Sequence, residues 1–323
     1  MASSVKPKTS VIIPAHNAGG FIADAIKSIL NQTAADFELI VVNDGSTDDT
    51  AARVRAFTDK RLRLIEQANQ GVAAARNCGI RASRGDYLAF LDSDDIAMPM
   101  RLEKQVAYLT SQPSVGLVGT AAEIWENNLP TGRFYRHPCW PPELAFAMLF
   151  ENYLVQSSVM VRRQVIERIG LYTELESRRP EDFELWSRVS RRFAMANLPE
   201  VLVTYRVRPG SICDTTNFDA NEVLLASENI ARAEGSLWIR PRHRTLAALM
   251  RGQQPTSRCK YAVLSTLLER LSRRIEKRFE QVPGALDNAL ALHRDNFRHH
   301  WERFYGPVPE ESSGALRQIR REL

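Results

Sequence analysis

The chain has 323 residues, of which 44% are hydrophobic and 25% are charged, a composition typical of a globular protein with about two domains. It excludes a disordered, collagen-like or coiled-coil protein. The longest apolar run, Leu144–Phe150, is far shorter than the roughly 18 residues that a membrane span needs. The start of the chain carries no secretory signal, and four cysteines without C-x-x-C spacing indicate a reducing compartment. We therefore expect a cytoplasmic protein.

The net charge of +5 is unevenly distributed along the chain. Residues 1–239 are slightly acidic, whereas residues 240–323 carry 17 Lys and Arg against 9 Asp and Glu. A basic tail indicates contact with something anionic, such as nucleic acid, a membrane surface or an acidic partner. The alternative is a solvated helical surface without such a partner.

Strand and helix patterns alternate over the first 95 residues. Short apolar runs predict strands at 10–14, 37–42, 63–65 and 87–91, and helical spacing predicts helices at 21–30, 51–57 and 71–82. Four strand–helix units in this order imply a mostly parallel sheet with right-handed crossovers, flanked by helices. The predicted fold class is α/β, with a Rossmann-like central sheet.

Beyond residue 100 the pattern is less regular. We expect helices at 101–109, 143–150 and 183–193, strands at 115–124, 157–161 and 201–207, and loops at 127–142 and 208–217. From about residue 220 helical patterns dominate and are interrupted by prolines. The expected organisation is an α/β domain over 1–220 followed by a basic helical extension over 221–323.

Polar clusters follow three of the predicted strands. His16–Asn17 follows the first strand, Asp44–Ser46 the second and Asp92–Asp95 the fourth. In an open parallel sheet, ligands bind beyond the carboxyl ends of the strands. A lone Asp there is usually a turn or cap residue, but three carboxylates within four residues repel one another unless a cation offsets their charge. Such oxygen ligands suit Mg²⁺ or Mn²⁺ together with a diphosphate.

An ordered set of segments resembles the successive signatures of family 2 glycosyltransferases. The segments are Ser10–Asn17, Val42–Thr50, Asn69–Asn77, Gly85–Asp95, Pro180–Arg188 and Tyr205–Ser211. The resemblance implies a GT-A fold and an inverting transfer of one sugar from a nucleotide-diphosphate donor, with UDP as the expected nucleotide. It also implies that residues 1–100 form the nucleotide-sugar half of the catalytic domain and residues 101–220 its acceptor half.

The resemblance further assigns roles to single residues. Asp44 would meet the base with Arg76 beside it, and Asp92 would hold the ribose. Asp94 would bind the Mn²⁺ or Mg²⁺ that bridges the diphosphate. Asp182 would be the general base that takes the acceptor proton, with Glu181 beside it, although an acidic pair at this place is also typical of a helix cap. The other implied nucleotide-sugar-binding residues are Pro14, His16, Asn17, Ser93 and Arg208.

Two positions depart from the family pattern. His16 stands where the family often has Tyr, and either ring can pack near a base. Arg208 stands where the family usually has His, and an Arg does not ligate metals but binds phosphate through two hydrogen bonds. We therefore expect the metal and Arg208 to share the neutralisation of the diphosphate.

The expected function is a metal-assisted glycosyltransferase in cell-surface polysaccharide or glycolipid assembly, with a glycan or lipid-linked acceptor. One alternative is a nucleotidyltransferase, although the Ala15–Gly20 loop lacks the basic residue of such enzymes. Another is a catalytically silent module that binds nucleotide sugars, which the intact Asp92, Asp94 and Asp182 disfavour. No nucleic-acid motif accompanies the basic tail, so nucleic acid is not an expected partner.

The basic tail contains an amphipathic segment at 264–282. One interpretation places its apolar stripe in the interface at the inner face of the cell membrane, with its cations near anionic headgroups. The other packs the stripe on the catalytic domain or on a second subunit of a homo-oligomer. The stripe consists of Leu264, Leu268, Leu271, Ile275, Phe279 and Val282, and the cations are Arg270, Arg273, Arg274, Lys277 and Arg278.

Overall fold

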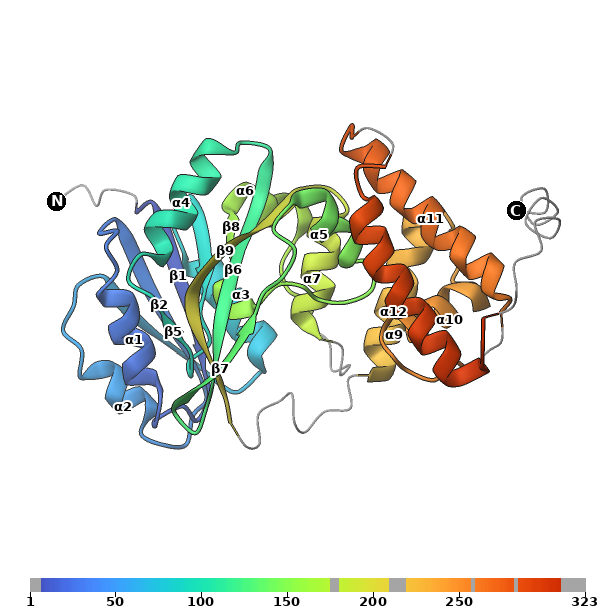
Figure 1. The fold of residues 1–323 in the computed structure, drawn as a ribbon. Coiled ribbons are helices and arrows are strands. Elements are labelled where there is room, and N and C mark those ends of the chain that lie inside the picture. The colour runs from blue at the N-terminus through green and yellow to red at the C-terminus, as the bar shows by residue number, and fades with distance from the viewer. Residues whose placement is uncertain (1–6, 175–179, 209–218, 257–258, 282–283, 309–323) are drawn as a thin grey trace. The chain divides into compact units, whose positions relative to one another are not determined.

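The computed structural model describes residues 7–174, 180–208, 219–256, 259–281 and 284–308. The chain divides into two compact units, an α/β unit and a helical unit (Figure 1). Residues 142–152, although they lie early in the chain, belong to the helical unit together with the helices that follow residue 218.

The first half of the sheet is parallel, as predicted. Its strands are β1 (Thr9–Ala15), β2 (Phe37–Asp44), β3 (Leu62–Gln67) and β4 (Tyr87–Phe90), which lie in the order β3-β2-β1-β4. They alternate along the chain with α1 (Ile22–Leu30), α2 (Thr50–Arg55) and α3 (Val72–Ala82). The predicted order of these four strands and three helices is confirmed.

Helices cover both faces of this parallel half. Along β2, Leu39 and Val41 join the cluster that contains the buried side of α1, while Ile40 and Val42 pack with Ala75 of α3. This alternation follows from the two-residue period of a strand, and it explains why β2 reads as a continuous apolar run. The sheet is therefore rigidly held on both sides, and its carboxyl-end loops project from a fixed base.

The second half of the sheet is mixed. It contains β8 (Met160–Arg162), β6 (Val115–Glu126), β9 (Ala194–Val207) and the short β5 (Ile96–Ala97), in this order after β4. Strand β8 is antiparallel to β4 and β6, and β9 is parallel to β6. The helices α4 (Arg101–Ser111), α6 (Arg163–Ile169) and α7 (Glu181–Ser190) belong to the same unit.

Two sequence expectations need correction here, and a third falls outside the described residues. The predicted loop at 127–142 contains β7 (Leu129–Tyr135), which pairs with β6. Asn127 and Asn128 both adopt positive φ, at 52° and 61°, and this conformation closes a tight hairpin that the sequence reading missed. The predicted strand at 157–161 begins as a 3-10 turn at Gln156–Ser158, and α6 had not been predicted. The expected loop at 208–217 lies outside the described residues, apart from Arg208.

The helical unit has its own core. It consists of α9 (Asp219–Glu234), α10 (Pro241–Met250), α11 (Tyr261–Arg278) and α12 (Asp287–Tyr305), together with residues of and after α5 (Pro141–Ala147). Apolar side chains from all of these segments form one cluster, which includes Phe146, Leu249, Leu268 and Phe297. The predicted helical character of the region beyond residue 220 is confirmed.

The apolar stripe of α11 lies inside this core. Leu264, Leu268, Leu271 and Ile275 are buried, and Phe279 packs against the same cluster; Val282 lies outside the described residues. The interpretation in which this stripe enters a membrane is therefore wrong, because the side chains that would insert are already covered by the neighbouring helices. The stripe is buried by packing, as the second interpretation expects, but the segments that cover it are the other helices of the same unit.

No helix among the described residues combines the length and the apolar character needed to cross a bilayer.

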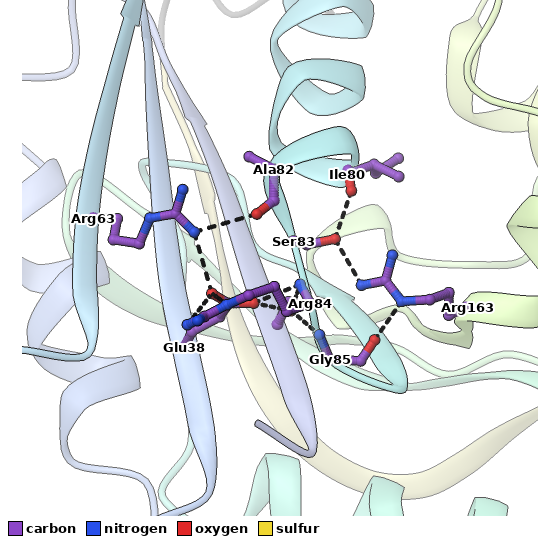
Figure 2. A network of polar contacts seen from close by, with 9 residues as sticks. Glu38, Arg63, Ile80, Ala82, Ser83, Arg84, Gly85 and Arg163 are labelled. Carbon is purple, nitrogen blue, oxygen red and sulfur yellow. Dashed lines mark hydrogen bonds and ion pairs between the residues drawn. The ribbon is translucent and has the colours of Figure 1, made fainter. Parts of the chain in front are cut away.

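A polar network closes the amino ends of the parallel strands (Figure 2). Glu38 at the start of β2 accepts hydrogen bonds from Ser10 Oγ (2.7 Å) and from the backbone nitrogen of Arg84 (2.6 Å), and it forms an ion pair with Arg63 (3.4 Å). Burial alone would raise the pKa of Glu38, but the hydrogen bonds from Ser10 and Arg84 lower it overall. Glu38 thus joins β1, β2 and β3 to the segment that leads into β4.

We predict that Glu38→Gln lowers the free energy of unfolding by about 1–3 kcal/mol, because the charged acceptor of several hydrogen bonds is lost. Since the folded-state pKa of Glu38 lies below its ordinary value, this stabilisation is present at neutral pH and is lost as the pH falls through the acidic range. Urea unfolding of both proteins at pH 7 and pH 4 measures the effect. Glu126→Gln, at an exposed ion pair with Arg133, is the control and should change little.

Candidate active site

The loops after β1 and β2 hold each other in place. His16 Nδ1 donates to the carbonyl oxygen of Asp44 (2.8 Å), and Asn17 Oδ1 accepts from the backbone nitrogen of Thr47 (2.8 Å). Asn17 has a positive φ of 48°, a conformation that Asn tolerates better than most residues. Pro14 is buried within β1 and leads into this turn. The structure thus brings together four residues that the sequence analysis assigned to the nucleotide site: Pro14, His16, Asn17 and Asp44.

The Asp44 carboxylate is buried and organises the loop that enters α3. One oxygen accepts from the backbone nitrogen of Gln70 (2.9 Å) and from Gln67 Nε2 (2.8 Å), and the other accepts from the backbone nitrogen of Gly71 (2.9 Å). These contacts fix the loop that precedes α3, the helix that carries Arg76. Both carboxylate oxygens are therefore engaged within the protein.

Arg76 lies at the centre of the site and its side chain is 4% exposed. Its Nη2 donates to Asp92 Oδ1 (2.8 Å) and its Nη1 donates to Glu181 Oε1 (2.6 Å). The guanidinium also faces the ring of Tyr172, with 5.5 Å to the ring centroid. Burial would lower the pKa of Arg76, but the charges of Asp92 and Glu181 raise it overall. The sequence analysis placed Arg76 beside Asp44; the contacts of its guanidinium are instead with these two carboxylates.

The acidic cluster after β4 is only partly neutralised by the protein. Burial and the nearby charge of Asp92 raise the pKa of Asp94, while Arg208 opposes this shift through an ion pair of 2.6 Å. Ser93 between them is buried. The guanidinium of Arg208 lies 5.0 Å from the ring centroid of Phe21. Arg208, the departure from the family pattern, therefore contacts the carboxylate that the resemblance assigns to the metal.

Asp95 serves the architecture of the site. It is buried, and Asp95 Oδ1 accepts a hydrogen bond from the backbone nitrogen of Arg206 (2.8 Å) in β9. Burial and the charges of Asp94 and Asp92 raise the pKa of Asp95 well above its ordinary value. The bond ties the end of β9 to the loop after β4, and so it positions Arg208 two residues further on.

Glu181 and Asp182 open α7, as the sequence analysis expected of an acidic pair. Burial raises the pKa of Asp182 to about 7, and the charge of Glu181 adds to this shift while Arg76 opposes it. Asp182 Oδ1 also accepts from the backbone nitrogen of Phe183 (2.7 Å). A carboxyl group with such a pKa is half ionised near neutral pH and suits general acid–base chemistry.

Three buried residues support this arrangement, and the sequence analysis did not assign them. Trp186 Nε1 donates to Gln156 Oε1 (3.0 Å), and Gln156 Nε2 donates to the hydroxyl oxygen of Tyr172 (2.9 Å). The chain of bonds links α7 to the ring beneath Arg76. Trp186 lies in the quoted Pro180–Arg188 segment and was within reach of sequence reasoning, whereas Gln156 and Tyr172 lie in no motif.

The carboxylates of the site fit a divalent cation that is held by only one or two protein ligands. Among the described residues, no group of three or more His, Cys, Asp or Glu side chains is placed to hold a metal ion. A closed all-protein site is therefore not present in this part of the chain. Asp94, whose pKa is raised by its burial and then by the charge of Asp92, would instead fit a Mg²⁺ or Mn²⁺ of the kind that takes one or two carboxylates together with phosphate and water oxygens.

Sequence comparisons identify the family. A family model described as Glycosyl transferase family 2 matches residues 10–170. An uncharacterized glycosyltransferase of Haemophilus influenzae is 34% identical over 237 residues, which cover 69% of this chain and 73% of that protein. The UDP-Glc:alpha-D-GlcNAc-diphosphoundecaprenol beta-1,3-glucosyltransferase WfgD of Escherichia coli is 30% identical over 206 residues, which cover 63% of this chain and 78% of WfgD.

Solved structures share the fold. The structure of S. aureus TarS residues 1–349 with UDP-GlcNAc is similar at a TM-score of 0.60 and 19% identity, over 91% of this chain and 90% of that chain. The mannosyltransferase PcManGT of Pyrobaculum calidifontis, in complex with GDP-Man and Mn²⁺, is similar at a TM-score of 0.54 and 17% identity, over 99% and 87%. The alternatives of a nucleotidyltransferase and of a silent binding module are set aside. The chain belongs to glycosyltransferase family 2 and is an enzyme with the GT-A fold.

Proposed function

We propose that this glycosyltransferase moves a single sugar from a nucleoside diphosphate donor, UDP-linked, to an acceptor hydroxyl with inversion at the anomeric carbon. The observation that carries the proposal is the contact of Arg76 with both Asp92 and Glu181, because it joins the loop after β4 to the start of α7. This contact brings the proposed donor side of the site next to Asp182, whose pKa is about 7.

The donor is assigned to the first 100 residues or so. Asp44 and His16 would border the base, Asp92 the ribose, and Pro14, Asn17 and Ser93 would line the same strand ends. Asp94 would hold a Mn²⁺ or Mg²⁺ that neutralises charge developing on the leaving diphosphate. Arg208, already at Asp94, would share that neutralisation through its guanidinium.

Asp182 is assigned as the general base. The acceptor oxygen forms a bond to the anomeric carbon as its proton passes to Asp182, and the bond from that carbon to the diphosphate oxygen breaks. Attack opposite to the leaving group inverts the anomeric configuration. Glu181, held by Arg76, positions the base beside it. Residues 101–220 would supply the acceptor half, and residues 221–323 would lie outside the chemistry.

A lipid-linked sugar is the proposed acceptor class, in cell-surface polysaccharide or glycolipid assembly. The support is the name of WfgD, whose acceptor is a GlcNAc-diphosphoundecaprenol. The test is a two-stage screen: hydrolysis of a panel of nucleotide sugars with and without Mn²⁺, followed by transfer to a synthetic GlcNAc-diphosphate lipid. Turnover of a nucleotide sugar supports the proposal, and inertness toward every donor in the panel contradicts it.

The first prediction concerns the metal. Asp94→Asn should weaken donor binding in the presence of Mn²⁺ by at least tenfold and should abolish the difference between buffers with Mn²⁺ and with EDTA, because the anionic ligand is lost. Isothermal titration with UDP-sugars measures both effects. Asp36→Asn, on the exposed segment before β2, is the matched control. Unchanged Mn²⁺ dependence in the Asp94 variant would show that the metal binds elsewhere or is not used.

The second prediction concerns the base. With a pKa of about 7 for Asp182, kcat/KM should rise about tenfold per pH unit below pH 7 and level off above it, since only the ionised carboxylate accepts a proton. Asp182→Asn should lower turnover roughly 10²–10⁴-fold and remove this pH dependence. Glu184→Gln, on the same helix and paired with Arg188, is the control. A near wild-type rate for Asp182→Asn would show that Asp182 is not the general base and serves only to cap the helix.

The third prediction concerns Arg76. Arg76→Gln leaves Asp92 and Glu181 without their shared cation, so the free energy of unfolding should fall by about 3–5 kcal/mol. The affinity for the donor should fall as well. Arg76→Lys keeps the positive charge but lacks the two nitrogens that donate to the two carboxylates. It should therefore be more stable than Arg76→Gln and less stable than the wild type. Thermal unfolding and donor titration report the two effects. Arg81→Gln, on the same helix but exposed, should behave as wild type; equal losses in the Arg76 and Arg81 variants would contradict the assigned role.

A further inference from the structure

The turn between α9 and α10 exposes two large apolar side chains next to each other. Leu237 is 92% exposed and Trp238 is 79% exposed, the two highest values among the exposed large hydrophobic residues of the described chain. Leu129 in β7 follows at 67%, and Leu292 on α12 at 63%. Single exposed leucines are ordinary on protein surfaces. An adjacent Leu and Trp that both expose most of their side-chain surface to water are not.

The turn holds these side chains in a defined place. Gly235 follows α9 with a φ of 80°, and its backbone nitrogen donates to the carbonyl oxygen of Arg232 (3.0 Å), while that of Ser236 donates to Ala231 (2.8 Å). This bonding pattern is the Schellman motif that ends many helices. Ser236 Oγ then donates to the carbonyl oxygen of Trp238 (2.8 Å). Leu237 and Trp238 thus project from an ordered turn, and fixing them on a surface costs little further backbone entropy.

The surroundings of the turn are basic. Arg240 follows the pair after one intervening residue, Ile239, and Arg244 lies one helical turn further along α10; both arginines are exposed. Arg274 of α11 is exposed as well and donates to the carbonyl oxygen of Ala233 (2.8 Å), which brings its guanidinium to the same turn. The nearby acid, Glu234, is already paired with Arg242 (2.5 Å) and His243 (2.6 Å).

We propose that Leu237 and Trp238, flanked by Arg240, Arg244 and Arg274, form a docking surface for an anionic phospholipid bilayer. Trp favours the boundary between headgroups and acyl chains, Leu reaches into the apolar side of that boundary, and arginines attract anionic headgroups. This surface differs from the buried stripe of α11 in both its residues and its accessibility. The proposal does not depend on the identity of the acceptor.

A second copy of the chain is a poorer occupant of the same surface. A symmetric dimer would bring the same patch from both copies together, and it would then bring Arg240, Arg244 and Arg274 of one copy near the same group of arginines of the other. Like charges placed so close to one another disfavour association. An anionic lipid surface satisfies both the apolar pair and the cations, and charge complementarity therefore favours the bilayer.

The test is flotation of the full chain with vesicles of phosphatidylcholine alone and with 30% phosphatidylglycerol, in about 50 mM and 500 mM NaCl. The vesicles contain neither donor nor acceptor, so the result is independent of the proposed catalysis. Binding should require the anionic lipid and should weaken at high salt. Leu237→Ser and Trp238→Ser should each reduce the partition coefficient about tenfold, and Arg240→Gln and Arg244→Gln about fivefold each.

Leu292→Ser is the matched control, since it removes an exposed leucine of the same unit away from the turn, and it should bind as wild type. Wild-type tryptophan emission should shift to shorter wavelength with anionic vesicles, and Trp238→Phe should lose the shift while still floating. No flotation of the wild type in low salt overturns the proposal. So does equal loss of binding in the Leu237 and Leu292 variants, or a concentration-dependent dimer that Leu237→Ser abolishes while vesicle binding is unaffected.

Discussion

A single buried guanidinium connects two distant parts of the chain at the site. Arg76 donates to Asp92, 16 residues away, and to Glu181, 105 residues away. Without a cation between them, two partly buried carboxylates would repel each other and each would lose much of its hydration. The position of α7 relative to the loop after β4 therefore depends on Arg76. That position in turn sets where Asp182 stands, and the ring of Tyr172 and the bonds through Gln156 and Trp186 support the same contact from behind.

The second constraint is the negative charge after β4. The protein offsets it in two different ways: Arg208 forms an ion pair with Asp94, and the backbone of Arg206 donates to the more deeply buried Asp95. Both come from the end of β9, so this strand aligns the loop as well as extending the sheet. The proposed metal ligand Asp94 is thus already paired with a cation of the protein itself.

The sequence predicts the parallel half of this molecule well and the rest less well, for physical reasons. Strands β1, β2 and β4 are buried on both faces, so their apolar runs and the polar residues that end them are visible without a structure. Strand β7 was not predicted because its residues are mostly exposed, and because its hairpin depends on the left-handed conformations of Asn127 and Asn128. An amphipathic stripe such as that of α11 predicts that these side chains are buried, but it does not indicate which surface covers them. For the same reason Gln156 and Tyr172, defined by long-range contacts alone, had no signal in the sequence.

The division of labour between Glu181 and Asp182 follows from which of them Arg76 contacts. A guanidinium donates short, charge-assisted hydrogen bonds to carboxylate oxygens. Arg76 makes that bond to Glu181, and Asp182 experiences burial and the charge of Glu181 more strongly than the opposing charge of Arg76, so its pKa rises to about 7. The proposed role of Asp182 as general base therefore depends first on its burial and then on the charge of Glu181 beside it, which together outweigh the opposing charge of Arg76.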